Sequence, residues 1–536
     1  MRRTVSRIIS LVLVAVILVS SITATVVSAE EYTDKTNIPV IYVVGQGIHL
    51  IIPAELNNGE EKKIYPVEMD TDYLIGVAEE NVGMFVNSVF TQDWSDFCDL
   101  VYDEVIKLYG PVALDENGQP KDGSVVDVPW SREEIESEYA KDGEYRVQTF
   151  EFPYDWRLDP YQTADDLHAY IETVLDVTGA EKVALMGRCL GACITMAYME
   201  KYEGEYVEKN ILYCSAFNGA TQCSKLFAGE MYLDADGVER FVYDLELGID
   251  EALKTLLNSF VTIANDNGLL DLALWSVNNV YGNIYLDIMP RLIRDTFGTF
   301  PGYWSMVSEE DYERAKEVVF YGSDAEKYAN FISIIDNYHY NVQAKGKELI
   351  AEWEEKGIET YNIVKYGYQS YPITTDSDKI SDSMVFVEWA SMGATCAEAG
   401  KTLANKYIQT AEEEGRGKYI SPDKQIDAST GYRPDRTWYI KGILHKEFPD
   451  SVNLLAALIV NNEDFLVSSN PDYPQFMVFE ESEEDEGEGP IVPMTGENHA
   501  TESGWNKNFF EASYEFMKSL FDVIISAIKN KAAQAV

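Results

Sequence analysis

The sequence has little positive charge. Of its 536 residues, 42 are Lys or Arg and 91 are Asp or Glu, which gives a formal net charge of −49. Because phosphate backbones bind basic surfaces, this charge excludes nucleic acid as an expected partner. It also predicts repulsion from an anionic membrane on average, and solubility in a salty, exposed compartment.

Cysteine and histidine are also scarce, with six and five residues. The cysteines form no Cys-x-x-Cys pair and no zinc-type spacing, so we predict no bound metal and no other cofactor. A secreted chain could form disulfides, but the sequence assigns no pairing and leaves the oligomeric state open. The cysteines are Cys98, Cys189, Cys193, Cys214, Cys223 and Cys396.

Apolar runs long enough to approach a membrane span are absent, except near the first residue. Three arginines precede an apolar run over residues 8–19, and residues 27–29 read Val-Ser-Ala. This order is typical of a secretory signal peptide, so we expect cleavage after residue 29 and a secreted, possibly surface-associated, protein. An uncleaved membrane anchor is the alternative, because the run nearly reaches spanning length.

What the sequence does contain is an alternation of strand-like and helix-like segments joined by short links. Short apolar, β-branched runs predict buried strands, and the segments between them have helical spacing. Such an alternation is typical of an α/β protein with a mostly parallel, doubly wound sheet. The expected strands lie at 38–45, 145–154, 181–187, 209–216, 359–368 and 436–445, and the expected helices at 162–177 and 190–202.

The regular alternation is interrupted once. Residues 217–358 have mainly helical patterns, so we predict an inserted cap there, with core residues 30–216 before it and 359–536 after it. Within the second part, the acidic run 480–489 is expected to be a solvated loop. A last helix is expected at 506–530, and its apolar face either packs on the protein or makes transient contact with a lipid surface.

One turn between a strand and a helix has the spacing of a nucleophile elbow. In Gly187-Arg188-Cys189-Leu190-Gly191, the glycines match the Gly-x-Ser-x-Gly pattern of α/β-hydrolases, and a cysteine occupies the serine position. A helix N-terminus and a nearby imidazolium would both favour its thiolate. The alternative is a small buried cysteine in an ordinary turn.

A second motif, "FPYDWRLDP" at 152–160, makes the elbow more specific. It resembles the Pro-Tyr-Asp-Trp-Arg-Leu segment that lecithin:cholesterol acyltransferases carry before their elbow, with Asp155, Trp156 and Arg157 near the site. The segments "IPVIYVVGQGIHL", "SAFNGATQCSKLFAGE" and "FGTFPGYWSMV" are similar to other parts of that family. The resemblance implies an α/β-hydrolase fold with an inserted cap and a lipid ester substrate. The family typically has serine where this chain has Cys189.

A catalytic triad on this fold also needs an acid and a histidine, in that order after the nucleophile. We predict His445, which follows an expected strand and matches the family's Gly-x-x-His stretch; His499 is the alternative. For the acid we predict Asp382, which precedes a helix-like segment at 393–413. Asp423 and Asp427 are the alternatives, although Asp423 lies in a turn-like sequence.

These residues predict covalent acyl transfer. The Cys189 thiolate would attack an ester carbonyl, and the backbone N–H groups of Leu190 and of Gln46 or Gly47 would stabilise the oxyanion. The expected function is that of a secreted lipid acyltransferase or esterase. The alternatives are a hydrolase of small or cell-wall esters on the same fold, and a non-catalytic binding protein, suggested by the replaced serine.

Overall fold

The computed structural model describes residues 38–67, 81–91, 93–141, 149–230, 288–370, 376–482 and 488–498. It also describes scattered residues between 73 and 80 and between 232 and 280, and residue 374. The expected signal peptide, His499, the middle of the acidic loop and the last expected helix lie outside the described residues.

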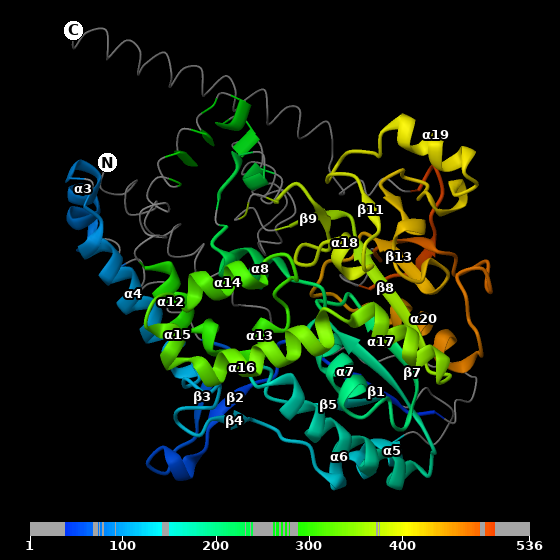
Figure 1. The fold of residues 1–536 in the computed structure, drawn as a ribbon, viewed down its shortest axis with the longest axis horizontal. Coiled ribbons are helices and arrows are strands. Elements are labelled where there is room, and N and C mark those ends of the chain that lie inside the picture. The colour runs from blue at the N-terminus through cyan, green and yellow to red at the C-terminus, as the bar shows by residue number, and fades with distance from the viewer. Residues whose placement is uncertain are drawn as a thin grey trace.

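An eight-stranded sheet forms the centre of the molecule (Figure 1), in the order β15-β14-β13-β8-β7-β6-β1-β5. Every neighbouring pair is parallel except β14 and β15. The fold is therefore α/β with a mostly parallel sheet, as predicted, and is compatible with an α/β-hydrolase fold. The strands are β1 (Val40–Val43), β5 (Thr149–Phe152), β6 (Val183–Arg188), β7 (Val207–Tyr213), β8 (Glu359–Tyr366), β13 (Thr437–Lys441), β14 (Phe476–Phe479) and β15 (Ile491–Pro493).

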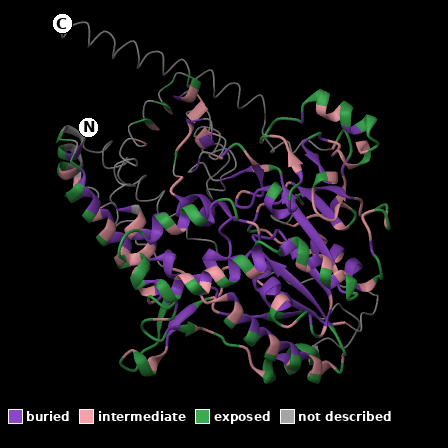
Figure 2. Ribbon diagram, viewed as in Figure 1, coloured by how far each residue is buried: buried purple, intermediate pink, exposed green. Residues whose placement is uncertain are grey.

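Apolar side chains on the two faces of this sheet form two buried clusters. One contains residues of α6 (Pro160–Thr178) and α7 (Leu190–Lys201), and the other contains residues of α20 (Asp450–Asn461). Burial is nearly continuous along the central strands (Figure 2), because a parallel sheet is covered on both faces. Because these strands are parallel, their carboxyl ends lie at the same end of the sheet.

Between β1 and β5 the chain forms a small antiparallel sheet and several helices that the sequence did not predict. The sheet has the order β3-β2-β4. These elements are β2 (Leu50–Ile52), η2 (Ala54–Leu56), β3 (Lys62–Tyr65), α3 (Val82–Thr91), α4 (Ser95–Tyr109), η3 (Gly110–Val112), β4 (Val125–Val126) and α5 (Arg132–Lys141).

Between β7 and β8 the described residues form helices and no strand. No helix in the described part of the chain is both long and apolar enough to cross a membrane. The limits of the expected cap stay a prediction. The helices are α8 (Thr221–Ala228), α12 (Met289–Asp295), η4 (Phe297–Thr299), α13 (Pro301–Trp304), α14 (Tyr312–Val319), α15 (Asp324–Lys327), α16 (Ala329–Tyr338), the π-helical turn η5 (His339–Gln343) and α17 (Gly346–Glu355).

After β8 the chain forms two short hairpin-like pairings, β9 with β10 and β11 with β12. The expected helix over 393–413 is shorter than predicted, because β11 occupies its first part and α19 begins at Asn405. The elements are β9 (Tyr368–Gln369), β10 (Ile380–Ser381), α18 (Val387–Ala390), β11 (Thr395–Cys396), α19 (Asn405–Glu413), η6 (Gly417–Tyr419), β12 (Ile426–Asp427), η7 (Ala428–Thr430) and η8 (Pro434–Arg436).

Candidate active site

Cys189 lies at a strained turn between β6 and α7. It is the N-cap residue of α7, with φ 53° and ψ −120°. A non-glycine residue in this region of backbone space is strained, and such strain is concentrated at functional sites. The side chain is buried, with 8% of the residue exposed. This is the geometry expected of a nucleophile elbow.

Glycines leave the space that this turn needs. A Cβ on Gly191 would lie 1.9 Å from the carbonyl oxygen of Val43, and one on Gly187 would lie 2.6 Å from the Cα of Ala192. Gly45 performs a related role that the sequence did not reveal. A Cβ there would lie 2.9 Å from the Cβ of Cys189 and 3.6 Å from its Sγ, so the loop after β1 runs directly beside the thiol.

His445 and Asp382 form a buried pair. The Nδ1 of His445 lies 2.7 Å from Oδ2 of Asp382, and the His445 backbone N–H donates to the Asp382 carbonyl at 2.8 Å. The other carboxylate oxygen accepts the backbone N–H groups of Met384 and Val385 at 3.1 and 2.9 Å. Nε2 of His445 is buried and has no hydrogen-bonding partner among the described residues. Because Nδ1 is bonded to Asp382, Nε2 is the nitrogen that can accept a proton from another group.

The two alternative acids are bonded elsewhere. Asp423 accepts from the ammonium of Lys441 at 3.0 Å and from the hydroxyl of Tyr366 at 3.1 Å. Asp427 is ion-paired with Arg416 and accepts from the Tyr407 hydroxyl. The structure therefore brings Asp382, and neither of these two carboxylates, to His445.

The electrostatics of the site link three groups. Burial raises the pKa of the Cys189 thiol, but the charges of His445 and Arg188 outweigh it, so the pKa lies below its ordinary value. Burial lowers the pKa of His445, yet Asp382 and Cys189 raise it well above its ordinary range. Burial likewise raises the pKa of Asp382, and the His445 charge brings it below its usual value. These directions favour a thiolate beside an imidazolium.

The Tyr154–Arg157 motif fixes the loop that passes the thiol. The hydroxyl of Tyr154 donates to the carbonyl of Val44 at 2.7 Å, and the indole N–H of Trp156 donates to the carbonyl of Ile48 at 3.2 Å. Both ends of the loop that carries the predicted oxyanion residues are thus tied to one segment.

The remaining residues of the motif and of the loop are also bonded. Arg157 binds both carboxylate oxygens of Asp155, at 2.9 and 2.6 Å. Within the loop, the Gln46 side chain donates to the Tyr65 hydroxyl, and Gly47 has φ 152°. The oxyanion role of Leu190, Gln46 and Gly47 stays a prediction.

One group of metal-ligand type overlaps this site. Within the described residues, Cys214, Asp382 and His445 bring one ligand atom each to within 4.8 Å of one another. Asp382 and His445 already bond each other, and the charges of Arg188 and Lys365 act on the same cluster. The positive charges of Arg188 and Lys365 would repel a metal cation at this position, so the group fits proton transfer better than metal binding.

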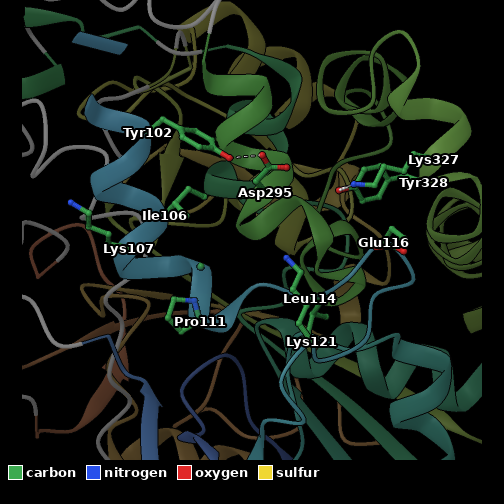
Figure 3. A pocket seen from close by; sticks show the side chains of 11 residues that line it. Tyr102, Ile106, Lys107, Pro111, Leu114, Glu116, Lys121, Asp295, Lys327 and Tyr328 are labelled. Atoms are coloured by element: carbon green, nitrogen blue, oxygen red, sulfur yellow. Dashed lines mark hydrogen bonds between the residues drawn. The ribbon is translucent and has the colours of Figure 1, made fainter. Parts of the chain in front are cut away.

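A cavity of about 570 Å³ lies elsewhere, between α4, η3, the 114–121 loop, α12 and α15 (Figure 3). The Tyr102 hydroxyl donates to Asp295 beside it at 2.7 Å. None of Cys189, Asp382 and His445 lines this cavity. It is therefore a separate feature of the surface.

Comparison with known proteins gives one family. Residues 135–233 match the family model described as Lecithin:cholesterol acyltransferase. No curated protein matches the chain. A chain in the solved structure titled "The crystal structure of Tle4-Tli4 complex" is 12% identical and covers 62% of this chain and 75% of its own, with a TM-score of 0.22. This similarity is too weak to support a conclusion about fold or function.

The matched segment contains both motifs on which the resemblance rested. It includes the Tyr154–Arg157 stretch and the whole elbow around Cys189. Residues 135–233 are therefore similar to the lecithin:cholesterol acyltransferase family, and Cys189 lies within the matched segment.

Proposed function

We propose that this protein transfers acyl groups from ester substrates through Cys189, with His445 as the base and Asp382 as the group that orients it. The family match supports an acyl-transferring or hydrolytic enzyme. The observation that carries the residue roles is the strained Cys189 whose thiol pKa is lowered by a His445–Asp382 pair. A non-catalytic scaffold gives no reason to keep a base acting on that sulfur.

The mechanism follows from the positions of the protons. The thiolate attacks the ester carbonyl, a C–S bond forms, and the alkoxide leaves with the proton of the imidazolium. Neutral His445 then takes a proton from water or an alcohol, whose oxygen attacks the thioester and releases the thiolate. Asp382 stabilises the imidazolium in both halves of the cycle. The N–H of Leu190, and that of Gln46 or Gly47, would bind the oxyanion.

The proposed substrate is a lipid ester, such as a phospholipid or acylglycerol. The support for this class is the family match, since the geometry of the nucleophile alone suits any ester. Small or cell-wall esters are the second candidate on the same chemistry. The length of the acyl chain that is turned over fastest distinguishes the two.

The experiment is hydrolysis of nitrophenyl esters of increasing chain length by the wild type, Cys189→Ala and Cys193→Ala. Cys193 is the matched control, because it is a buried cysteine one turn further along α7. We expect loss of activity in Cys189→Ala only, with an optimum at long chains. Activity that survives in Cys189→Ala would contradict the proposed nucleophile. An optimum at acetyl esters would favour the small-ester hydrolase.

We also propose that the protein is exported. The support is the basic, apolar and small-residue order of residues 1–29. The test is the N-terminal sequence of protein recovered outside the producing cells. A chain that begins near residue 30 is expected, whereas an intact N-terminus in the membrane fraction would indicate an anchor.

A further inference from the structure

The segment that carries His445 is bonded through its backbone carbonyls to a buried lysine. Lys365, near the carboxyl end of β8, donates to the carbonyls of Leu444, His445 and Glu447 at 2.7, 2.8 and 2.9 Å. An ammonium group has three donors and no acceptor, so these three bonds use its full capacity. The residue is 1% exposed.

A second buried cation reaches the same segment from the nucleophile's strand. Arg188 is the last residue of β6, immediately before Cys189, and its guanidinium donates to the carbonyls of His445 and Lys446 at 2.9 and 2.8 Å. The guanidinium also lies 5.7 Å from the centre of the Phe448 ring. The His445 carbonyl therefore receives one N–H from each cation. The strand that ends at the nucleophile is thus tied directly to the loop that carries the base.

Burying two cations is costly unless their donors are satisfied, so this arrangement needs a compensating role. A purely structural role would be satisfied by any carbonyls. Here all five bonds to backbone carbonyls go to Leu444–Glu447. Beside these bonds, Arg188 interacts with Tyr42 and Phe448, and the Lys365 ammonium lies 5.1 Å from the centre of the Tyr213 ring. The two cations act on each other, and further titratable groups act on one or both of them: Tyr42, Glu151, Cys189, Tyr213, Cys214, Asp382 and Glu447.

We propose that Arg188 and Lys365 are positioning residues, which fix the backbone of Leu444–Glu447 so that the imidazole of His445 faces the Cys189 thiol. This inference rests on the proposed function, because it takes His445 as the partner of Cys189. Neither side chain is assigned a contact with substrate. Both side chains act on where the imidazole lies and, through it, on how much of Cys189 is thiolate. Arg188 also favours the thiolate directly through its charge.

The chain supplies a matched control in Lys209. This lysine is also buried in the central sheet, near the start of β7, and also donates to backbone carbonyls, those of Ile459 and Asn462 at the end of α20. Lys209→Met removes the same ammonium from the same sheet, away from His445. It therefore measures what the loss of a buried lysine costs the fold alone.

The experiment compares Lys365→Met, Arg188→Lys and Lys209→Met with wild type by two readouts. The first is the pH dependence of Cys189 alkylation by iodoacetamide, followed on the Cys189 peptide by mass spectrometry. The second is kcat and KM for a nitrophenyl ester. We expect the alkylation midpoint to move to higher pH in Lys365→Met and Arg188→Lys. We expect kcat to fall by about 10- to 100-fold with KM nearly unchanged.

The sign of the alkylation shift separates position from charge. Removing the Lys365 charge alone would favour the imidazolium and so leave the thiolate of Cys189 as stable or more stable. Arg188→Lys keeps the positive charge but removes the planar guanidinium, whose Nη2 donates to both the His445 and the Lys446 carbonyl. An upward midpoint in either variant therefore reports a displaced imidazole.

The proposal is overturned if Lys365→Met and Arg188→Lys behave as Lys209→Met does in both readouts. If Lys365→Met does not fold, Lys365→Arg replaces it, with the same expectation. A wild type that shows a low-pH thiolate but turns over no ester would contradict the proposed function. In that case the alkylation comparison still decides the positioning roles.

Discussion

Two buried thiols lie one helical turn apart and have opposite pKa shifts. Cys189 is the N-cap residue of α7 and directly follows the carboxyl end of β6. Cys193 lies within α7, and its thiol donates to the Ser305 carbonyl at 3.5 Å. Burial is the largest influence on both and raises both pKa values. At Cys193 it raises the pKa to about 12. At Cys189 the charges of His445 and Arg188 reverse the shift.

The difference shows that burial does not determine the reactivity of a cysteine in this protein. Two buried thiols of the same helix differ in pKa because one lies beside the imidazole of His445 and the other donates to a backbone carbonyl. The neighbours that lower the pKa of Cys189 come from β6 and from the loop after β13. Changing those neighbours one at a time should therefore reduce the pKa difference between Cys189 and Cys193.

The largest effect is expected from His445→Ala. Without the imidazole, burial prevails at Cys189 as it does at Cys193, so both thiols should alkylate only at high pH. Turnover should fall by about 10²- to 10⁴-fold because the acid and base are lost. The measurements are peptide-resolved alkylation and ester hydrolysis, with His168→Ala, a histidine on α6, as control. Unchanged Cys189 alkylation in His445→Ala would contradict the assigned pair.

Asp382→Asn should reduce the pKa difference between Cys189 and Cys193 without abolishing it. An amide keeps the size of the side chain but cannot stabilise the imidazolium, so turnover should fall by about 10- to 100-fold. Asp423→Asn is the matched variant, because that aspartate is also buried but is bonded to Lys441 and Tyr366. Steady-state kinetics of the two variants decide which aspartate serves His445. A greater loss in Asp423→Asn would favour the alternative acid.

Cys189→Ser should move the acid limb of the pH–rate profile to higher pH. In the proposed mechanism the active form is thiolate with imidazolium, so wild-type activity should persist down to the lowered pKa of Cys189. A serine needs neutral imidazole as its base, and Asp382 raises the pKa of that imidazole. Activity in the variant should therefore be lost already as the pH falls through the higher value. The test is kcat/KM against pH for both proteins, and superimposable acid limbs would argue against the ion pair.

Gly45→Ala should produce the smallest effect and act on one thiol alone. Its new methyl group would lie 2.9 Å from the Cys189 Cβ, so either the loop or the elbow must shift. Overpacking of this kind costs about 1–3 kcal/mol of unfolding free energy. Alkylation rates should change at Cys189 and stay the same at Cys193. Gly496→Ala is the control, because no atom lies within 4 Å of its new methyl group and, like Gly45, Gly496 does not have a positive φ.

Much of the central sheet could be predicted because its strands are short, apolar and ended by glycine or proline. The runs at 181–187 and 209–216 correspond to β6 and β7 with ends that differ by at most three residues, and the elbow spacing placed Cys189 between β6 and α7. The small β3-β2-β4 sheet was not predicted. Its strands are two to four residues long, too short for a period to be visible.

The residue types of the candidate site could be predicted from the sequence, but the hydrogen bonds that join them could not. The order of cysteine, aspartate and histidine follows from the fold, but the bond between His445 and Asp382 depends on how two long loops meet. Lys365 offered one signal, as the one basic residue in the expected strand at 359–368. Its partners are backbone carbonyls, which every residue possesses, so no sequence pattern could identify them.

The bond between Arg188 and the His445 carbonyl joins residues 257 positions apart in the chain. A contact of such long range forms late, because the intervening chain must be ordered before it can close. In a partly folded chain whose β13 has not docked, Cys189 lacks His445, the neighbour that lowers its pKa most. A low-pH thiolate at Cys189 therefore reports that this long-range contact has formed, and a nascent or truncated chain would lack it.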